Sequence, residues 1–539
     1  MGHSAYVDTF AADNLPAREL WPDLINLDKL GYPDRLNCAS ELLDTAVRDG
    51  FGDKILIYSP ERNWTYREIQ IEANHIAHVL RDDMQMATGE RVLLHGPNTP
   101  TMVAAWFGIL KAGGIVVGTM PMLRAREIGI ILEKAQVRLA LSDHRTAEEV
   151  RLAESPVLKK LVTYGDGELE SLTAPKSDNF DAVDTAADDV SLIAFTSGTT
   201  GMPKGTMHFH RDVLAICDCF PASILKADEN DIFAGSPPLA FTFGLGGILL
   251  FPMRVRASTV MLEKAPPPEL TKACQEFGVS VVFTSPTGYR FMLDNLKDFD
   301  LSRLRKCVSA GETLPKATSD AWFAATGIRI IDGIGSTEML HIFISAGGNH
   351  IRPGSTGKPI PMYEAKIIGP KGETLSDDEI GRLAVRGPTG CRYLADARQK
   401  EYVRDGWNLT GDAYSRDKDG YYWFQARTDD MILSGGYNIS GPEIEEALLT
   451  HPGVRECAVV GSPDEMRGNI VKAFVVLREN GPAACPETCS MLQDFVKQQI
   501  APYKYPRAIE FVESLPKTEN GKLQRFKLRQ MEVERQRSV

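Results

Sequence analysis

Hydrophobic and polar residues in the first 190 positions alternate between short apolar runs and longer amphipathic stretches. The runs RVLLHGP (91–97), IVVGTM (115–120) and VRLALSD (137–143) are bounded by turn residues and predict buried strands. A helical pattern at 99–114 lies between the first two runs and ends at a pair of glycines. Another strand pattern follows at 158–166. Strands and helices that alternate in this way predict an α/β fold with parallel sheets.

The longest apolar region spans residues 101–122 and is interrupted by Lys111, Gly113 and Gly114. A membrane-spanning helix needs about 20 predominantly apolar residues in succession. The interruption therefore predicts a buried helix, a turn and a strand, and no membrane span. Because the N-terminal residues MGHSAYVDTF lack the apolar core of a signal peptide, we expect a cytoplasmic protein.

A different pattern begins near residue 381, where glycine turns separate aromatic runs. The segment DKDG (417–420) predicts a hairpin between two of these runs. After Asp429 the chain returns to a mixture of strand and helix patterns, so we expect a boundary between Arg427 and Asp430. Strands are predicted at 431–440, 456–464 and 472–480, and helices at 441–451 and 489–500.

Composition limits the classes of function. With 539 residues, the chain is too long for a single core, so two or more domains are expected. The formal net charge of −12 argues against a nucleic-acid-binding surface, which would be basic. The nine cysteines are scattered without the paired spacing of a zinc site. They are therefore expected to be buried free thiols in a reducing compartment.

The segment TSGTTGMPKG (196–205) combines the features of a phosphate-binding loop. Glycine lets backbone N–H groups converge, serine and threonine add hydroxyl donors, and Lys204 adds positive charge. It is not a Walker A loop, because Lys204 stands between Pro203 and Gly205 rather than before a serine or threonine. A loop of this composition alone is also typical of a flexible linker.

The ordered decapeptide resembles the signature loop of the adenylate-forming superfamily. This superfamily includes acyl- and aryl-CoA ligases, luciferases and the adenylation domains of peptide synthetases. Further family motifs follow in the family's order across most of the chain. They are SAGETLP (309–315), DGIGSTEMLH (332–341), LTGD (409–412), ARTDD (426–430) and PKTENGKLQR (516–525). Each short motif alone is typical of a surface turn or a helix cap, but their occurrence together in the family's order indicates membership rather than coincidence.

The resemblance implies the roles of individual residues. Lys522, Glu338 and Thr337 are expected to be catalytic, and Glu338 to bind Mg²⁺, which prefers oxygen ligands. Asp429 is expected to be a hinge, and Gly435 and Gly436 to border the path of coenzyme A. The residues expected to bind ATP or AMP are Thr196, Ser197, Gly198, Thr199, Thr200, Lys204, Gly311, Glu312, Asp332, Gly333, Asp412 and Arg427.

The resemblance also implies a fold and a domain organisation. An N-terminal domain over residues 1–428 would contain stacked, mostly parallel β-sheets with helices and a β-barrel-like subdomain. A small, mobile α+β domain over residues 429–539 would carry the catalytic lysine and rotate between reaction steps. We expect a monomer or a homodimer.

The implied reaction uses ATP, Mg²⁺ and coenzyme A. In the first step a carboxylate attacks the α-phosphorus of ATP and gives an acyl-adenylate and pyrophosphate. Mg²⁺ on Glu338 and the Lys522 ammonium would reduce the repulsion between carboxylate and triphosphate. In the second step the thiolate of coenzyme A attacks the activated carbonyl, and AMP leaves.

The expected acid pocket contains Phe241, Phe243, Gly335 and His341. Aromatic and small residues suit a flat aromatic acid better than a long alkyl chain. The string DGIGSTEMLHIFIS is similar to benzoate–CoA ligases, whereas ARTDDMILSGGYNISGPEIE (426–445) is more similar to 2-aminobenzoate–CoA ligases. For His341 the alternative is a hydrogen-bonded histidine of the core.

Three positions depart from the common family pattern. Ile334 stands where many relatives stack a tyrosine on adenine, so the ring would be held by apolar packing. Leu433 replaces a frequent lysine and Ala426 a frequent glycine. None of these changes removes an expected catalytic group.

The sequence is also compatible with other functions. Within enzymes they are a medium-chain or other acyl–CoA ligase, an adenylation enzyme that loads a carrier protein, and a luciferase-type oxidase. A nucleotide-binding regulatory protein with this fold would be expected to lack the catalytic residues, but this chain has Glu338, Asp412, Arg427 and Lys522.

Overall fold

The computed structural model describes residues 3–196, 203–427, 430–434, 437–464, 468–500, 504–517 and 523–537. The chain forms two compact units, which are Met1–Ala365 with Val385–Leu409, and Lys366–Ala384 with Thr410–Val539. The expected mixed α/β fold, with a large sheet-rich N-terminal part and a smaller C-terminal part, is confirmed. The boundary expected between 428 and 429 and the mobility of the smaller part stay predictions.

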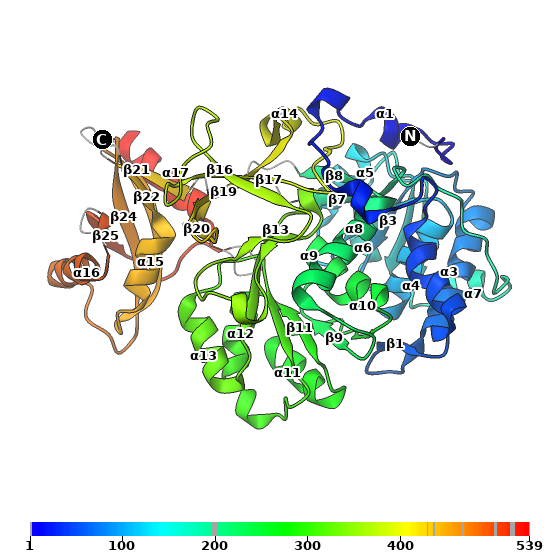
Figure 1. Ribbon diagram of the computed structural model, residues 1–539, viewed down its shortest axis with the longest axis horizontal. Helices are drawn as coiled ribbons and strands as arrows, with labels where there is room; N and C mark the ends of the chain where they lie inside the picture. The colour runs from blue at the N-terminus through cyan, green and yellow to red at the C-terminus, as the bar shows by residue number, and fades with distance from the viewer. Residues whose placement is uncertain are drawn as a thin grey trace. The chain divides into compact units, whose positions relative to one another are not determined.

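A six-stranded sheet lies in the first unit (Figure 1). Neighbouring strands in it are parallel, except for the last pair, which forms an antiparallel hairpin. The four apolar runs between residues 91 and 166 are four of its strands, as predicted. In spatial order the strands are β6 (Lys160–Tyr164), β5 (Leu139–Asp143), β3 (Arg91–His95), β4 (Ile115–Thr119), β7 (Val190–Thr196) and β8 (Lys204–Phe209).

The predicted helix, turn and strand at 99–120 are confirmed. Helix α4 (Pro100–Lys111) begins after Thr99, whose Oγ1 accepts a hydrogen bond from the backbone N–H of Met102 at 3.1 Å. Gly113 adopts a φ of 78° in the turn before β4. The buried Lys111 is tolerated because its Nζ lies 2.6 Å from Asp44 Oδ1. Within the described ranges, every helix is too short or too polar to cross a membrane.

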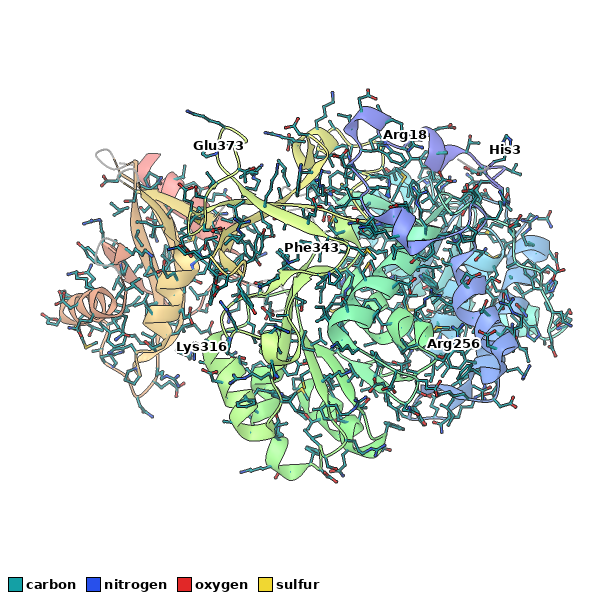
Figure 2. The ribbon with its side chains drawn as sticks, viewed as in Figure 1. His3, Arg18, Arg256, Lys316, Phe343 and Glu373 are labelled. Carbon is teal, nitrogen blue, oxygen red and sulfur yellow. The ribbon has the colours of Figure 1, made fainter. Side chains whose placement is uncertain are left out.

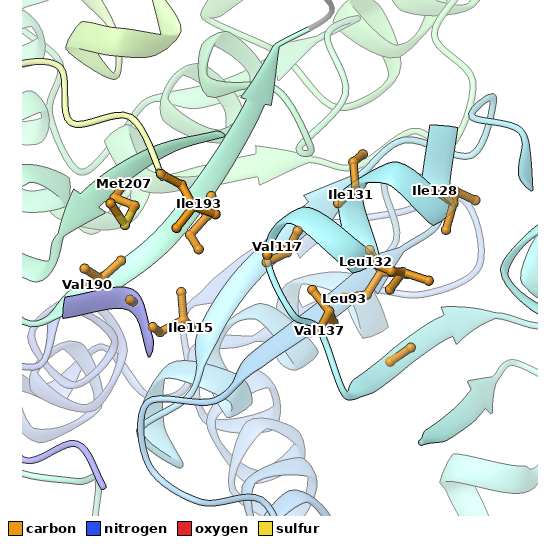
Figure 3. Close-up of a cluster of buried hydrophobic side chains, with 14 of the residues drawn as sticks. Leu93, Ile115, Val117, Ile128, Ile131, Leu132, Val137, Val190, Ile193 and Met207 are labelled. Atoms are coloured by element: carbon orange, nitrogen blue, oxygen red, sulfur yellow. The ribbon is translucent and has the colours of Figure 1, made fainter. Parts of the chain in front are cut away.

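An apolar cluster packs the β7–β8 hairpin of this sheet together with its central strands and helix α5 (Figure 3). Ile128, Ile131 and Leu132 on helix α5 pack into this cluster together with Leu93 and Val117 of the central strands. Ile193 of β7 and Met207 of β8 belong to the same cluster and are fully buried. The two strands that lead into and out of the glycine-rich loop are therefore fixed by the core. Helices of this part include α3 (Tyr66–His78), α5 (Ala125–Lys134), α6 (Ala147–Leu152), α7 (Glu168–Thr173) and α8 (His210–Phe220).

A nine-stranded sheet forms the rest of the first unit's framework. Phe343 on β14 is fully buried in it, whereas Lys316 at the start of α13 is exposed (Figure 2). In spatial order its strands are β15 (Lys358–Pro359), β14 (Ile342–Ser345), β13 (Ile330–Gly335), β12 (Lys306–Ser309), β11 (Val281–Thr284), β9 (Ile232–Gly235), β10 (Ser258–Val260), β1 (Ile55–Tyr58) and β2 (Trp64–Thr65). Helices α11 (Pro267–Glu276), α12 (Pro286–Leu293) and α13 (Lys316–Thr326) cover one side with a shared apolar core.

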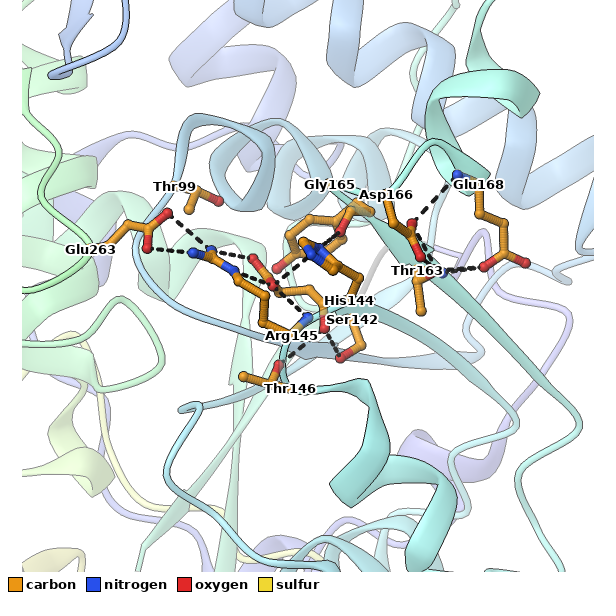
Figure 4. Close-up of polar contacts among 12 residues, drawn as sticks. Thr99, Ser142, His144, Arg145, Thr146, Thr163, Gly165, Asp166, Glu168 and Glu263 are labelled. Carbon is orange, nitrogen blue, oxygen red and sulfur yellow. Dashed lines mark hydrogen bonds and ion pairs between the residues drawn. The ribbon is translucent and has the colours of Figure 1, made fainter.

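Ion pairs connect the two sheets (Figure 4). Asp143 ends β5, and Arg145 contacts its carboxylate through Nε and NH2 at 2.8 and 2.7 Å. The same guanidinium contacts Glu263, which follows β10, at 2.9 and 3.0 Å. Two bidentate contacts from one arginine define both the distance and the orientation of the joined segments. The arginine therefore ties the carboxyl end of one sheet to the other.

The DKDG turn connects β19 and β20 as the predicted hairpin, with Gly420 at a φ of 82°. The surrounding five-stranded sheet has the order β16-β17-β19-β18, with β20 paired to β19. Whether it completes a barrel-like subdomain stays a prediction. Its strands are β16 (Glu364–Ile368), β17 (Gly381–Arg386), β18 (Val403–Arg404), β19 (Trp407–Arg416) and β20 (Tyr422–Arg427).

The last part of the chain has the expected α+β composition. The single strand predicted at 431–440 is instead two antiparallel strands, β21 and β22, on either side of the two glycines. The other predicted strands and helices are present. The elements are β21 (Met431–Ser434), β22 (Tyr437–Ser440), β23 (Val454–Asp464), β24 (Gly468–Leu477), β25 (Ala508–Phe511), α15 (Gly441–Leu449), α16 (Pro486–Gln499) and α17 (Arg525–Arg537).

Five further α-helices are short. They are α1 (Phe10–Asp13), α2 (Leu27–Leu30), α9 (Thr242–Leu245), α10 (Phe251–Arg254) and α14 (Gln399–Tyr402), which precedes β18. All nine cysteines are free thiols, and seven of them are buried, as expected.

Candidate active site

The stem of the phosphate loop is an antiparallel hairpin in which Thr196 pairs with Lys204. Ser197, Gly198, Thr199 and Thr200 lie outside the described residues. Lys134 at the end of α5 contacts the residue directly before β8. Its Nζ donates to the carbonyl of Pro203 at 3.1 Å and pairs with Asp396 Oδ2 at 2.8 Å. Hydrogen bonds from Arg398 and Lys134 hold the pKa of Asp396 well below its usual range, so this carboxylate stays charged.

Lys204 and Glu338, both predicted site residues, are brought together by a third side chain. The Lys204 Nζ donates to the Tyr393 hydroxyl at 3.3 Å. That hydroxyl donates to Glu338 Oε1 at 2.5 Å. The three residues come from β8, from the turn after β13 and from the segment after β17. A lysine and a carboxylate expected to act on ATP thus contact the same phenol hydroxyl.

Thr337 and Glu338 lie in a tight turn, the short helix η8 (Thr337–Met339). Ser336 caps the turn by accepting a hydrogen bond from the Met339 N–H at 3.2 Å. Leu340, directly after the turn, has a φ of 70°, which is unfavourable for a residue with a side chain. His208 on β8 donates from Nε2 to the carbonyl of Thr337 at 2.8 Å. The Ser336 cap and the His208 hydrogen bond therefore hold the turn in a conformation that is strained at Leu340.

A fully buried ion pair lies next to His208. The NH2 atom of Arg392 is 2.9 Å from Asp212 Oδ2, and the guanidinium lies 4.0 Å from the ring centroid of Phe209. His208 Nδ1 is 3.9 Å from the same carboxylate oxygen. Burial lowers the pKa of His208 to about 4, although Asp212 opposes this shift. His208 is therefore neutral near pH 7, with its proton on the nitrogen that faces Thr337.

The carboxylate of Glu338 fits Mg²⁺ as a ligand. Its Oε1 accepts the Tyr393 hydrogen bond, while no described residue donates to Oε2. Among the described residues, no three His, Cys, Asp or Glu side chains form a group able to hold a metal ion by themselves. In nucleotide sites Mg²⁺ is typically held by one or two carboxylates together with substrate phosphates and water.

Further residues expected to bind ATP or AMP lie just after β12 and in the middle of β13. Gly311 adopts a φ of 86°, and the exposed Glu312 accepts from Thr287 Oγ1 at 2.7 Å. Gly333 is buried, and a Cβ there would lie 2.9 Å from Ile342. Asp332 borders a small cavity, and its Oδ1 is shielded from solvent without a hydrogen-bond partner among the described residues. The cavity is lined by Leu314, Ser319, Ile330, Asp332, Ala346, Ile351, Arg352, Pro353, Gly354, Ser355 and Thr356.

Burial raises the pKa of Asp332 to about 7. In the unfolded chain a free aspartate titrates near pH 4. Between these values the folded state binds more protons than the unfolded state, so Asp332 lowers stability progressively as the pH rises toward 7. We therefore expect Asp332→Asn to raise the melting temperature more at pH 8 than at pH 5. Calorimetry at both pH values would measure this, and an equal effect at both would contradict the raised pKa.

The residues expected at the acid lie at the start of α9, on β13 and after the Glu338 turn. Phe241 is 42% exposed, while Phe243 is half-buried with its ring centroid 5.7 Å from that of His341. Gly335 cannot carry a side chain, because a Cβ would lie 2.7 Å from the His341 backbone. Phe243, Gly335 and His341 are thus brought together.

His341 is buried in a cage of phenyl rings. The ring centroids of Phe251, Phe220 and Phe283 lie 4.5, 5.8 and 6.4 Å from that of the imidazole. Neither ring nitrogen has a hydrogen-bond partner among the described residues. Burial lowers the pKa of His341 to about 3, so the imidazole is neutral. A backbone contact with Phe243 opposes this shift, and the role of His341 as a pocket residue or as a core histidine stays a prediction.

In the C-terminal motifs, Asp412 on β19 and Arg427 on β20 are direct partners in the antiparallel register. The Arg427 side chain, together with Asp429, Gly435, Gly436 and Lys522, lies outside the described residues, and the roles of all five stay predictions.

Four residues of the site were missed by sequence reasoning, namely Tyr393, His208, Asp212 and Arg392. Side chains alternate along a strand, so His208 shares a face of β8 with Lys204. This period-2 relation was a signal that could have identified it. No comparable signal exists for Tyr393, whose partners are 189 and 55 residues away.

Comparisons with known proteins agree with this site. The AMP-binding enzyme family matches residues 44–393, and the AMP-binding enzyme C-terminal domain matches residues 443–522. The benzoate–CoA ligase of Thauera aromatica is 35% identical over 92% of this chain and 96% of its own length. The mitochondrial acyl-coenzyme A synthetase ACSM3 of Mus musculus is 31% identical over 94% of this chain and 92% of its own length.

A solved structure is similar over almost the whole chain. The crystal structure of the anthranilate CoA ligase AuaEII in complex with anthranoyl-AMP superposes with a TM-score of 0.86. It is 35% identical and covers 93% of this chain and 98% of its own. The expected superfamily is confirmed, and this chain belongs to the family of AMP-binding enzymes.

Proposed function

We propose that the protein is an AMP-forming ligase that joins an aromatic carboxylic acid to coenzyme A through an acyl-adenylate. The observation that carries this proposal is the chain of contacts from Lys204 through Tyr393 to Glu338 at the stem of the phosphate loop. It brings together a cation for the leaving pyrophosphate and a carboxylate for Mg²⁺. Relatives named as benzoate and anthranilate CoA ligases support both the reaction and the acid.

In this proposal the substrates are the acid, ATP and coenzyme A, and the products are the aryl thioester, AMP and pyrophosphate. Bound Mg²⁺ would be held by Glu338 and would reduce the charge on the phosphates during attack at the α-phosphorus. Lys204 would hold pyrophosphate as it leaves. Lys522 would supply a second cation for adenylation, and Asp412 with Arg427 would bind the ribose.

The phenyl cage around His341 supports an aromatic acid. Phe220, Phe251 and Phe283 are fully buried against His341, and the half-buried Phe243 would contact a planar ring beside the imidazole. A neutral, buried imidazole without a partner is costly unless a ligand supplies one. An amino or hydroxyl substituent on the ring can donate to one nitrogen of His341. We therefore propose 2-aminobenzoate or a hydroxybenzoate as the preferred acid over unsubstituted benzoate.

A medium-chain acyl–CoA ligase is the second candidate, and an apolar cavity favours it. The cavity lies between the six-stranded sheet, α4 and α9, beside Thr242 of the predicted acid segment. All but Thr242 of its lining side chains are apolar, which suits an alkyl chain. The lining residues are Leu94, Met102, Trp106, Val116, Gly118, Leu192, Ile193, Ala194, Leu239, Ala240, Thr242, Leu245 and Leu249.

A panel of acids tests the proposal. Pyrophosphate release would be measured with benzoate, 2-aminobenzoate, 4-hydroxybenzoate, hexanoate and octanoate, with and without coenzyme A. We expect the substituted benzoates to have the highest kcat/KM. His341→Phe should lower their kcat/KM about tenfold relative to that of benzoate, since one buried hydrogen bond is lost. Higher kcat/KM for hexanoate or octanoate would instead support the second candidate.

The control for this panel is Phe323→Leu, an exposed aromatic change on α13. It should leave the order of substrates unchanged. The cytoplasmic location and the monomeric or dimeric state are also proposals, which cell fractionation and light scattering would test.

A further inference from the structure

Tyr393 is a fully buried tyrosine whose hydroxyl lies between two groups proposed to act on ATP. It donates to Glu338 Oε1 at 2.5 Å and accepts from Lys204 Nζ at 3.3 Å. The Lys204 Nζ also lies 5.1 Å from the centroid of the phenol ring. A single side chain therefore contacts both the lysine of the phosphate loop and the carboxylate proposed for Mg²⁺.

The backbone around Tyr393 is fastened to the strand that follows the phosphate loop. Tyr393 forms an antiparallel bridge with Thr206. The next N–H, that of Leu394, donates to the carbonyl of Gly205 at 2.8 Å. On the other side, the Tyr393 N–H donates to Gln399 Oε1 at 2.9 Å. The phenol thus has a rigid base and cannot follow Glu338 or Lys204 if either side chain moves.

The Tyr393 hydroxyl keeps its proton. The ordinary pKa of a tyrosine is about 10, so a phenol carries its proton at neutral pH. A protonated phenol can donate only one hydrogen bond, and here Glu338 receives it. A hydrogen bond to an ionised carboxylate is about twice as strong as a neutral one, so this contact restrains the carboxylate.

We propose that Tyr393 is a positioning residue for adenylation, which holds one oxygen of Glu338 and leaves the other for the metal ion. The inference rests on the proposed function, since it assumes that Glu338 binds Mg²⁺ with ATP. The oxygen left over is Oε2, to which no described residue donates. Without the hydroxyl, the carboxylate would rotate freely and Lys204 would lose its acceptor.

Tyr393→Phe tests this inference, because it removes the hydroxyl and keeps the ring. Mn²⁺ would replace Mg²⁺ as the probe, and its binding would be measured by electron paramagnetic resonance with a non-hydrolysable ATP analogue. We expect the Mn²⁺ dissociation constant to rise about tenfold. The Mg²⁺ concentration for half-maximal pyrophosphate release should rise equally, whereas thioester formation from a supplied aryl-adenylate should stay unchanged.

Tyr289→Phe is the matched control. Tyr289 is equally buried, and its hydroxyl lies 3.0 Å from the backbone carbonyl oxygens of Val282 and Val308, away from Glu338 and Lys204. It should lower the melting temperature without changing Mn²⁺ affinity. A Mn²⁺ affinity of Tyr393→Phe within twofold of the wild type would overturn the inference.

A double variant separates positioning from a general loss of structure. If Tyr393 acts through Glu338, adding Tyr393→Phe to Glu338→Gln should weaken Mn²⁺ binding no further. Additive losses would instead show a structural effect and reject the inference. Mn²⁺ and nucleotide binding need no acid, so a wild-type protein that binds both but activates no aromatic acid would refute only the proposed function.

Discussion

Lys522→Ala is expected to lower the rate of pyrophosphate release by about three orders of magnitude while leaving thioester formation from a supplied aryl-adenylate nearly unchanged. Only the first step brings a carboxylate against a triphosphate, and a positive charge at the reacting atoms lowers that barrier most. A thousandfold loss corresponds to about 4 kcal/mol, which is within the range for removing one such group. The second step begins from a neutral acyl group and does not need this ammonium.

The two half-reactions are measured separately, by pyrophosphate release without coenzyme A and by thioester formation from chemically prepared adenylate. Lys527→Ala, an exposed lysine five positions further along, is the matched control and should leave both rates unchanged. Equal losses in both half-reactions of Lys522→Ala would contradict the proposed division of labour.

Glu338→Gln is expected to reduce adenylation by about a hundredfold or more and to raise the Mg²⁺ requirement. Glutamine keeps an oxygen acceptor for the Tyr393 hydroxyl, so the buried contact and the fold should survive. It removes the negative charge that would hold the metal ion. Because a metal ion bound to the reacting phosphates stabilises the transition state by several kcal/mol, weaker metal binding should slow adenylation. The readouts are kcat at saturating ATP and its dependence on Mg²⁺ concentration.

The control for Glu338→Gln is Glu401→Gln, which makes the same change at an exposed position. It should keep the wild-type rate and Mg²⁺ dependence. If Glu338→Gln retained a normal Mg²⁺ dependence and lost only melting temperature, Glu338 would be a structural residue and not a metal ligand.

Much of the fold was predictable because local patterns and tertiary packing agree. The run at 91–97 forms β3 and the helical pattern at 99–114 forms α4, since turn residues separate a buried strand from a capped helix. The strand predicted at 431–440 was wrong in detail, because its apolar residues continue on both sides of two glycines. Periodicity alone does not distinguish one strand from a hairpin of two.

The candidate site was predictable only where a motif carries its chemistry in consecutive residues. Lys204, Thr337 and Glu338 belong to such motifs. Tyr393 and Arg392 do not, because their roles arise from contacts with residues more than 50 positions away. The buried pair of Arg392 and Asp212 has no local periodicity, so only the folded structure brings the charges together.

His341 shows how the structure adds to a motif. The family string placed it near the acid, but a hydrogen-bonded core histidine was equally consistent with the residues. The structure adds its cage of phenyl rings and shows that neither ring nitrogen has a hydrogen-bond partner among the described residues, and its role at the acid stays a prediction. That distinction depends on packing and on hydrogen-bond partners, which a sequence pattern does not contain.

In the proposed first step, the carboxylate of an aromatic acid attacks the α-phosphorus of ATP. The most direct test is a reaction with 2-aminobenzoate labelled with ¹⁸O in both carboxyl oxygens, followed by mass spectrometry of the nucleotide product. We expect the AMP to carry one ¹⁸O atom, because the attacking oxygen stays on phosphorus when the thiol displaces AMP. Unlabelled AMP, or label in inorganic phosphate with ADP as the product, would contradict it.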